Sequence, residues 1–300
     1  MPVIDPKSLP ERELYQLLVG LVAPRPIAFV STTDVAGVPN LAPYSFFNVF
    51  SSNPPIVVFS SNRTPTGAAR KDTLANVEAT GEVVINMVNH AIAGQMTITS
   101  IAYPPEVNEF EKAGLTPLPA DLVRPFRVKE SPAQLECKVQ KIIPLGDGPG
   151  AGNLVICEVV RIHLNKHILD ESGRISPEKT DLMGRLGRTF YVRASGDAVY
   201  SMFQPTDRIG IGFDRLPPSA LHSKILTGNE LAKIAGMQEL PSAEEIEAGE
   251  KLLKVSDFRK NEDPVDKLHN MAKSALEMDN TQLAAICILV GEKIKNQSSG

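Results

Sequence analysis

A group of basic and hydroxyl-bearing residues near position 70 has the chemistry of a phosphate site. Lys71 directly precedes Asp72 and Thr73, where the pattern predicts the start of a helix. The first N–H groups of a helix have no partners within the helix and carry partial positive charge. Together with the ammonium of Lys71 and the hydroxyl of Thr73, they would suit a ligand phosphate. The residues alone leave a simpler interpretation open, in which Asp72 or Thr73 is only the N-cap of its helix.

Two neighbouring segments could complete a pocket around such a phosphate. The polar cluster Ser-Ser-Asn-Arg at 60–63 follows an apolar, β-branched run, although these residue types are also common in turns. Residues 40–48 mix aromatic, small and amide side chains on a predicted strand and loop, where the phenylalanines equally suit a core. Arg25 lies between two prolines that hold its backbone extended. Composition and spacing therefore predict a polar, partly basic pocket at the end of a strand.

The sequence does not support other recognisable sites. The glycine-rich stretch 146–152 lacks the Gly-Lys-Ser/Thr ending of a phosphate loop and precedes a strand, so it predicts a hairpin turn. No GxGxxG motif follows an early strand, which argues against a Rossmann site. His163 and His167 are four residues apart but follow a strand, and no HExxH pair occurs. We therefore expect no metal site. No acid–base pair or nucleophile stands out either.

The elements that would position these residues are mostly short strands. Apolar, β-branched runs predict strands at 27–33, 38–44, 55–60, 83–88, 135–143 and 154–164. The last two flank the glycine-rich stretch as a long hairpin. One helix is expected from Asp72 or Thr73 to the residue before Gly81, and another over 105–112 before Gly114. Because strands and helices do not alternate regularly, the pattern favours an antiparallel barrel with inserted helices over a doubly wound parallel sheet.

From about residue 215 the hydrophobic period becomes helical. Thr227 and Ser242 each stand three residues before a glutamate, which predicts two capping boxes. Apolar residues then recur at helical spacing between 268 and 278, and a final apolar helix is expected over 281–294. We therefore expect a mainly β domain over 1–205 and a helical C-terminal extension over 206–300, with the linker between 205 and 218.

Composition limits the class of protein. The 300 residues are 42% hydrophobic and 22% charged, which suits a globular chain with a substantial core. A net charge of −4 argues against a nucleic-acid partner. Three widely spaced cysteines fit neither a disulfide framework nor a zinc site. No secretory signal pattern opens the chain, and no apolar run approaches the roughly 20 residues of a membrane span, so we expect a cytoplasmic protein without a membrane partner.

Several stretches, in the right order, resemble the flavin reductase-like FMN-binding family, which includes flavoredoxin. They are PRPIAFVSTTDVAGVPNLAPYSFFNVFSSNPPIVVFSS, KDTLANVEATGEVVINMV, PPEVNEFEKAGL, SPAQLECKV and GDGPGAGNLVICEVVRIH. The resemblance covers about residues 10–195. It implies a split β-barrel, antiparallel and Greek-key-like, as the FMN-binding domain over 1–205.

The resemblance also implies which residues bind the FMN. The isoalloxazine ring would lie against Ser45, Phe46, Phe47 and Asn48, whose backbone N–H groups would face its carbonyls. The ribityl chain and phosphate would be lined by Ser60, Ser61, Asn62 and Arg63, with Lys71, Asp72 and Thr73 at the phosphate end. Family members are similar homodimers whose flavin sits at the subunit interface. His163 could approach the flavin from the partner subunit, although its place at a strand end favours a surface or interface histidine.

The implied function is that of an FMN-dependent oxidoreductase. A hydride from NADH or NADPH would pass to FMN and on to free flavin or a bound small molecule, while the protein supplies position and access. Two alternatives stay open. One is an FMN-binding electron carrier without efficient NAD(P)H turnover. The other is a barrel kept only as an interaction module, against which Lys71 and the serine cluster argue.

Overall fold

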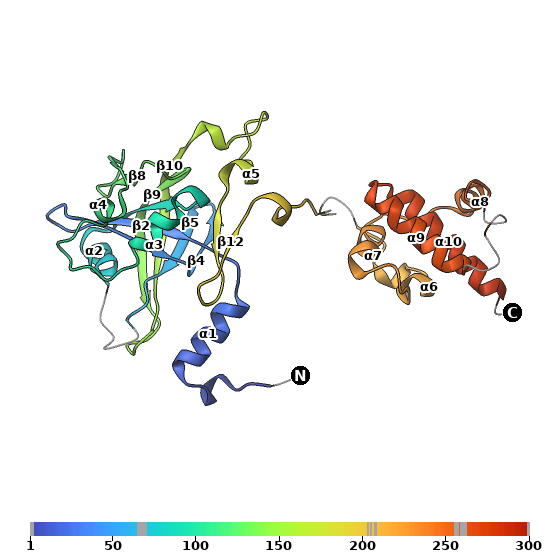
Figure 1. Ribbon diagram of the computed structural model, residues 1–300, viewed down its shortest axis with the longest axis horizontal. Coiled ribbons are helices and arrows are strands. Elements are labelled where there is room, and N and C mark those ends of the chain that lie inside the picture. Colours follow the sequence, from blue (N-terminus) through green and yellow to red (C-terminus); the bar gives the residue numbers. More distant parts are fainter. Residues whose placement is uncertain are drawn as a thin grey trace. The chain divides into compact units, whose positions relative to one another are not determined.

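The computed structural model of the chain describes residues 3–64, 71–202, 204, 206, 209–254, 258 and 263–298. The chain divides into two compact units, Met1–Tyr200 and Ser201–Gly300, drawn from blue to yellow and from yellow to red in Figure 1. No buried apolar cluster contains residues of both units, so each unit has its own core: two clusters in the first unit and one in the second. No helix among the described residues is long and apolar enough to cross a bilayer.

A seven-stranded antiparallel sheet dominates the first unit. Its strands, in spatial order, are β3 (Pro39–Tyr44), β2 (Ala28–Thr33), β6 (Glu82–Met87), β9 (Ala133–Pro144), β10 (Asn153–Leu164), β5 (Pro55–Ser60) and β4 (Phe47–Ser52). Two smaller sheets consist of β1 (Arg25–Pro26), β11 (Met183–Arg185) and β12 (Tyr191–Arg193), and of β7 (Pro117–Leu118) and β8 (Arg127–Val128). The prediction of a mainly β, antiparallel fold is confirmed.

The sheet is curled but not closed. Strands β3 and β4 are its two edges, and no ladder joins them in the described part of the chain, so the closed barrel expected from the strand pattern is not formed. Only Ser45 and Phe46 separate the end of β3 from the start of β4. Since each residue spans at most about 3.6 Å, the two edges must come close together at this point. The short connection therefore bends the sheet and brings residues 44–47 to the gap between its edges.

Most predicted strands are confirmed because their patterns are local. The long hairpin pairs β9 with β10 along their whole length. Val155 and Cys157 on β10, which pair with residues of β5, are buried in the core. The segment 47–52, where the sequence pattern predicts no strand, forms β4, which is bulged between Val49 and Ser51. All six residues of β2 are buried, since both faces of this strand are covered.

Helices cover parts of this sheet. Helix α2 (Asp72–Thr80) packs on β2 and β3, and α4 (Glu109–Ala113) packs on β3. Gly81 and Gly114 follow these helices in the left-handed conformation, at φ 67° and 63°, as C-caps do. The second helix is shorter than the predicted 105–112, because it begins only after its N-cap Asn108. The structure adds three helices beyond those expected from the sequence: α1 (Glu11–Leu21), α3 (Ala93–Ile98) and α5 (Pro177–Thr180).

The second unit is helical, as predicted. It contains α6 (Pro218–Leu221), α7 (Gly228–Ala235), α8 (Ala243–Leu252), α9 (Pro264–Glu277) and α10 (Thr281–Ser298). Thr227 and Ser242 form the two predicted capping boxes. Helix α10 is central, since it contacts all four of the others. The predicted linker 205–218 is wrong at its C-terminal end: Ile211 donates its N–H to Met237, and Leu216 is buried in this unit's core.

Candidate functional site

A pocket of about 900 Å³ opens in the first unit beside the connection between β3 and β4. Helix α1, the 43–46 segment, the residues after β5 and the turn of the β9–β10 hairpin surround it. Its lining residues are Glu11, Arg12, Leu14, Tyr15, Leu18, Pro43, Tyr44, Ser45, Phe46, Ser60, Asn62, Arg63, Thr64, Lys71, Pro149, Gly150 and Ala151. Segments distant in the sequence thus meet at the gap between the sheet edges.

Arg25 fixes two walls of this pocket. Its buried guanidinium donates hydrogen bonds to the carbonyl oxygens of Val19 (2.6 Å) and Val22 at the end of α1, and to Leu186 O at 3.1 Å. The guanidinium also lies 5.8 Å from the centre of the Phe46 ring. Because one cation binds the C-terminal carbonyls of α1 and faces the 45–46 segment, it sets the distance between the helix and the aromatic wall.

The polar cluster after β5 is organised by the glycine-rich turn. Ser60 Oγ donates to Asn62 Oδ1 at 2.9 Å, and Asn62 Nδ2 donates to Gly150 O at 3.1 Å. The backbone N–H of Arg63 donates to Ala151 O at 2.9 Å. Residues 60–63 can therefore form a turn and line the pocket at the same time. The hydrogen bonds that hold the turn also place Ser60, Asn62 and Arg63 on the pocket.

Lys71 supplies a second basic group. Its ammonium lies 5.1 Å from the centre of the Tyr44 ring, and desolvation of that ammonium lowers the pKa of Lys71, although the residue as a whole is exposed. Lys71, rather than Asp72 or Thr73, is the N-cap of α2, and its side chain makes no capping bond. The start of α2 therefore lacks the side-chain acceptor that most helices have there. Arg70, its neighbour, lies outside the described residues.

Six of the eleven predicted residues line the pocket: Ser45, Phe46, Ser60, Asn62, Arg63 and Lys71. The other five, Phe47, Asn48, Ser61, Asp72 and Thr73, do not. Thr73 is 1% exposed, and its hydroxyl accepts a hydrogen bond from Asn40 Nδ2 at 2.8 Å. Thr73 is therefore held in the interior beneath the helix start, where its hydroxyl bonds with Asn40.

Helix α1 is the part of the site that sequence reasoning missed. Five of its residues line the pocket, and the Tyr15 ring lies 6.4 Å from that of Phe46. A signal was present: Leu14, Leu17 and Leu21 recur at helical spacing after Pro10. The contribution of residues 149–151 had no sequence signal, because it depends on the pairing of β10 with β5.

His163 has a structural role. Its Nε2 lies 2.6 Å from Glu136 Oε1, and Glu136 also accepts the N–H groups of Asp121 and Leu122. Burial alone would raise the pKa of Glu136, but these hydrogen bonds outweigh it and hold the pKa below its ordinary value. Ligand atoms of Asp121, Glu136 and His163 lie within 4.8 Å of one another, the spacing of a metal site. The Glu136 carboxylate already accepts three hydrogen bonds. These bonds connect β9, β10 and the 121–122 loop, which accounts for the close spacing of the three side chains.

Comparison with known proteins identifies the sheet unit. A family model described as a flavin reductase like domain matches residues 21–178. Nitrilotriacetate monooxygenase component B from Bacillus cereus is 35% identical with a TM-score of 0.62, over 68% of this chain and 98% of its own. A 2-nitrobenzoate 2-nitroreductase from Pseudomonas fluorescens is 30% identical with a TM-score of 0.59, over 69% and 98%. A protein from Aquifex aeolicus is 44% identical over 185 residues, which are 61% of this chain and 91% of its own. The two solved structures leave about a third of this chain uncovered, and the Aquifex aeolicus relative and the family model leave more.

Proposed function

Because the chain belongs to the flavin reductase like domain family, we propose that it is an FMN-dependent oxidoreductase that takes hydride from NADH or NADPH and passes electrons to free flavin or another small acceptor. The observation that carries the proposal is the 900 Å³ pocket, where an aromatic wall and basic residues border one space. Its size and mixed lining are typical of cofactor sites. When bound, the flavin supplies the redox chemistry, which agrees with the lack of an obvious acid–base pair.

Lys71, Arg63 and the start of α2 would hold the phosphate. Lys71 has no carboxylate partner in the described part of the chain, and α2 begins without a side-chain cap. Arg63 lines the same pocket, pairs with the exposed carboxylate of Asp147 at 3.5 Å, and would supply a second cation there. Thr73 then supports the helix start through Asn40 and does not touch the phosphate itself.

The flavin ring would lie between α1 and the 45–46 segment. Phe46 and Tyr15 are 36% and 49% exposed, so both offer apolar surface to a ligand. Arg25 holds the two walls at their separation, and Ser45 lies within 3.5 Å of the Arg25 Nε. In this arrangement the chain's own residues orient the ring and exclude water from one side. The curled sheet then corresponds to the split barrel implied by the sequence resemblance.

The proposal includes a homodimer. Val49 and Phe50 on the edge strand β4 are 66% and 68% exposed, and Ile162 on β10 is 57% exposed. Apolar side chains on an unpaired edge strand favour association with a second copy. The flavin site lies beside the start of this strand, so a partner subunit there would complete the site. The cytoplasmic location stays a prediction from the sequence.

The experiment is an anaerobic mixing of the FMN-loaded protein with NADH or NADPH, followed by the flavin absorbance. The proposal predicts rapid bleaching of the flavin band, since hydride transfer reduces the ring. Flavin that binds but does not bleach would support the electron carrier instead. A protein that leaves FMN fluorescence unchanged in a titration would contradict both functions.

A further inference from the structure

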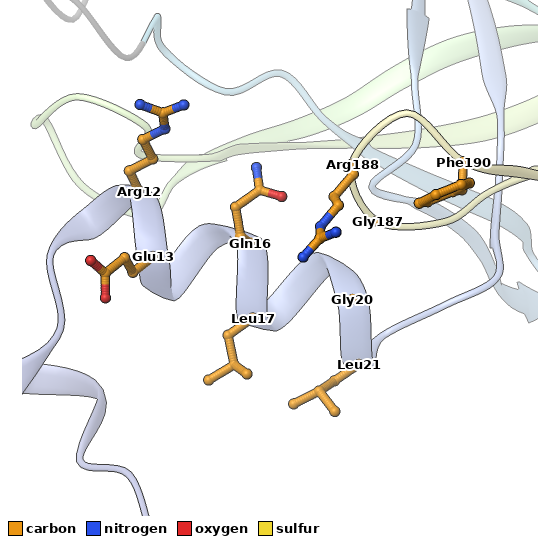
Figure 2. Close-up of a pocket in the computed structure, with 9 residues that line it drawn as sticks. All are labelled: Arg12, Glu13, Gln16, Leu17, Gly20, Leu21, Gly187, Arg188 and Phe190. Carbon is orange, nitrogen blue, oxygen red and sulfur yellow. The ribbon is translucent and has the colours of Figure 1, made fainter.

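A second groove, of about 800 Å³, lies along α1 in the same unit (Figure 2). It is formed between this helix and the turn that joins β11 to β12, residues 186–190. Arg12, which also lines the proposed flavin pocket, lies at one end of it. The two spaces therefore share a residue and border the same helix.

The floor of the groove is bare backbone. A Cβ added to Gly187 would lie 3.2 Å from the Cα and 3.5 Å from the N of Gly20, so the turn and the helix touch here without intervening side chains. Any side chain at Gly187 would push the turn away from α1. The contact leaves a shallow channel whose walls are the side chains on either side.

The turn holds Arg188 against the helix. Arg185 donates hydrogen bonds to the carbonyl oxygens of Arg188 at 2.6 Å and Phe190 at 3.3 Å, and its guanidinium stacks 4.5 Å from the centre of the Tyr191 ring. Arg188 has a left-handed backbone, at φ 55°, which an arginine rarely adopts. Figure 2 shows its guanidinium reaching over α1 between Gln16 and Gly20. A constrained turn thus presents a charged side chain at a fixed place.

The groove carries a net positive charge next to an aromatic ring, since its lining includes two arginines and one glutamate. Neither Arg12 nor Arg188 forms an ion pair within the described ranges of the chain. Glu13 also lines the groove, but in Figure 2 its carboxylate lies at the end opposite Phe190, beyond Arg12. Phe190 is 60% exposed, a large apolar surface for a side chain on a turn. Two guanidinium groups and an open ring together suit a ligand that joins phosphates to an aromatic base.

We propose that this groove binds the adenosine end of the hydride donor and selects NADPH over NADH. The proposal rests on the proposed function, since it assigns the donor of that reaction. The phosphate on the adenosine ribose distinguishes the two nucleotides, and Arg188 would bind it through charge-assisted hydrogen bonds. Phe190 would stack with the adenine, which both nucleotides share. Because Arg12 borders both spaces, the rest of the dinucleotide can run along α1 toward the flavin pocket.

The test measures binding of NADP⁺ and NAD⁺ to the full-length, FMN-loaded protein by calorimetry, because the oxidised nucleotides bind without reacting. The wild-type protein should bind NADP⁺ more tightly than NAD⁺. Arg188→Asn suits the left-handed backbone and removes the charge, so it should weaken NADP⁺ by about tenfold and NAD⁺ by much less. Phe190→Ala should weaken both nucleotides equally. Arg174→Ala, a change at another exposed arginine, should alter neither.

Two results would overturn the assignment: equal affinity of the wild-type protein for the two nucleotides, or an Arg188→Asn variant that keeps the wild-type ratio. An FMN titration of each variant separates this outcome from a failure of the proposed function. If FMN binds normally and the nucleotide ratio is unaffected, only the groove assignment is wrong. If the wild-type protein does not bind FMN, the oxidoreductase proposal fails, and the groove is tested by the same calorimetry without flavin.

Discussion

The two units of the chain treat buried polar groups differently. In the sheet unit, buried polar side chains form a connected set: Asn40 donates to Thr32 and Thr73, and the partly buried Asn76 donates to Thr32. In the described part of the helical unit, only Ser219 and His269 are polar among the buried residues. Burying a polar group costs free energy unless it is hydrogen-bonded. The sheet unit sustains such groups where they support a site, whereas the helical unit is organised mainly by apolar packing.

The relatives divide the chain in the same way. The family match at 21–178 falls entirely within the sheet unit. The proposed chemistry therefore depends on the first unit, while the second unit has its own apolar core. Changes in the two units should therefore have separable effects on flavin binding and on stability.

We expect the largest effects from substitutions in the apolar cores of the two units, which should change the stability of each unit separately. Ile288 on α10 and Ile85 on β6 are both fully buried. Replacing either with Ala should lower the free energy of unfolding of its own unit by about 2–5 kcal/mol. Chemical denaturation followed by circular dichroism and by FMN fluorescence should show that Ile288→Ala keeps FMN bound and Ile85→Ala promotes its loss. Release of FMN by Ile288→Ala would show that the units are energetically coupled.

A smaller effect is expected from the residue that holds the pocket walls. Arg25→Ala removes hydrogen bonds to three carbonyls and frees the end of α1. We expect FMN and riboflavin affinities to fall together by about tenfold, because the loss concerns the walls around the ring. Fluorescence titrations with both flavins measure this. A selective loss of FMN would instead place the Arg25 guanidinium at the phosphate.

The smallest effect concerns pH and the helical unit. Burial lowers the pKa of His269 from its ordinary value of 6.5, against the opposing charges of Asp266, Asp263 and Glu292 and alongside that of Lys295. Its ring nitrogens have no hydrogen-bond partner among the described residues. Below pH 6.5 the unfolded chain takes up a proton that the folded unit excludes, so stability is full above that pH and falls as pH decreases. Between about pH 7 and pH 5.5 the loss should be measurable and at most about 1 kcal/mol.

Helical circular dichroism during urea unfolding at the two pH values measures the loss. His269→Met keeps a similar volume without a titrating group, so its stability should change less between the two conditions. An equal decrease in wild-type and variant proteins would assign the pH dependence to other residues.

Local patterns predicted the elements, and non-local pairing determined the site. Residues 55–60 and the β9–β10 hairpin carry their own strand signals, and Gly81 ends α2 in the left-handed conformation that glycine favours. Residues 47–52 became a strand because β5 pairs with them. Whether the edges of a curled sheet join depends on contacts between β3 and β4, and neither segment shows this in its own sequence.

The same distinction applies within the site. Ser60, Asn62 and Lys71 were predictable because their polar or basic character follows a strand or precedes a helix. The interior position of Thr73 was not, since it depends on Asn40, 33 residues earlier in the chain. The helical spacing of Leu14, Leu17 and Leu21 predicts α1, but the place of Arg12 and Tyr15 on the pocket depends on how this helix packs beside the 43–46 segment.

The most direct test of the central claim is the ratio of FMN affinity to riboflavin affinity in wild-type protein and in Lys71→Ala. Lys71 lines the pocket, and its side chain does not cap α2, so its removal should leave the helix intact. A hydrogen bond to a charged group contributes about 1.5–3 kcal/mol. The substitution should therefore weaken FMN by about ten- to a hundredfold and leave riboflavin, which has no phosphate, nearly unchanged. A Lys71→Ala variant with the wild-type ratio would place the phosphate elsewhere and contradict the assignment of this pocket.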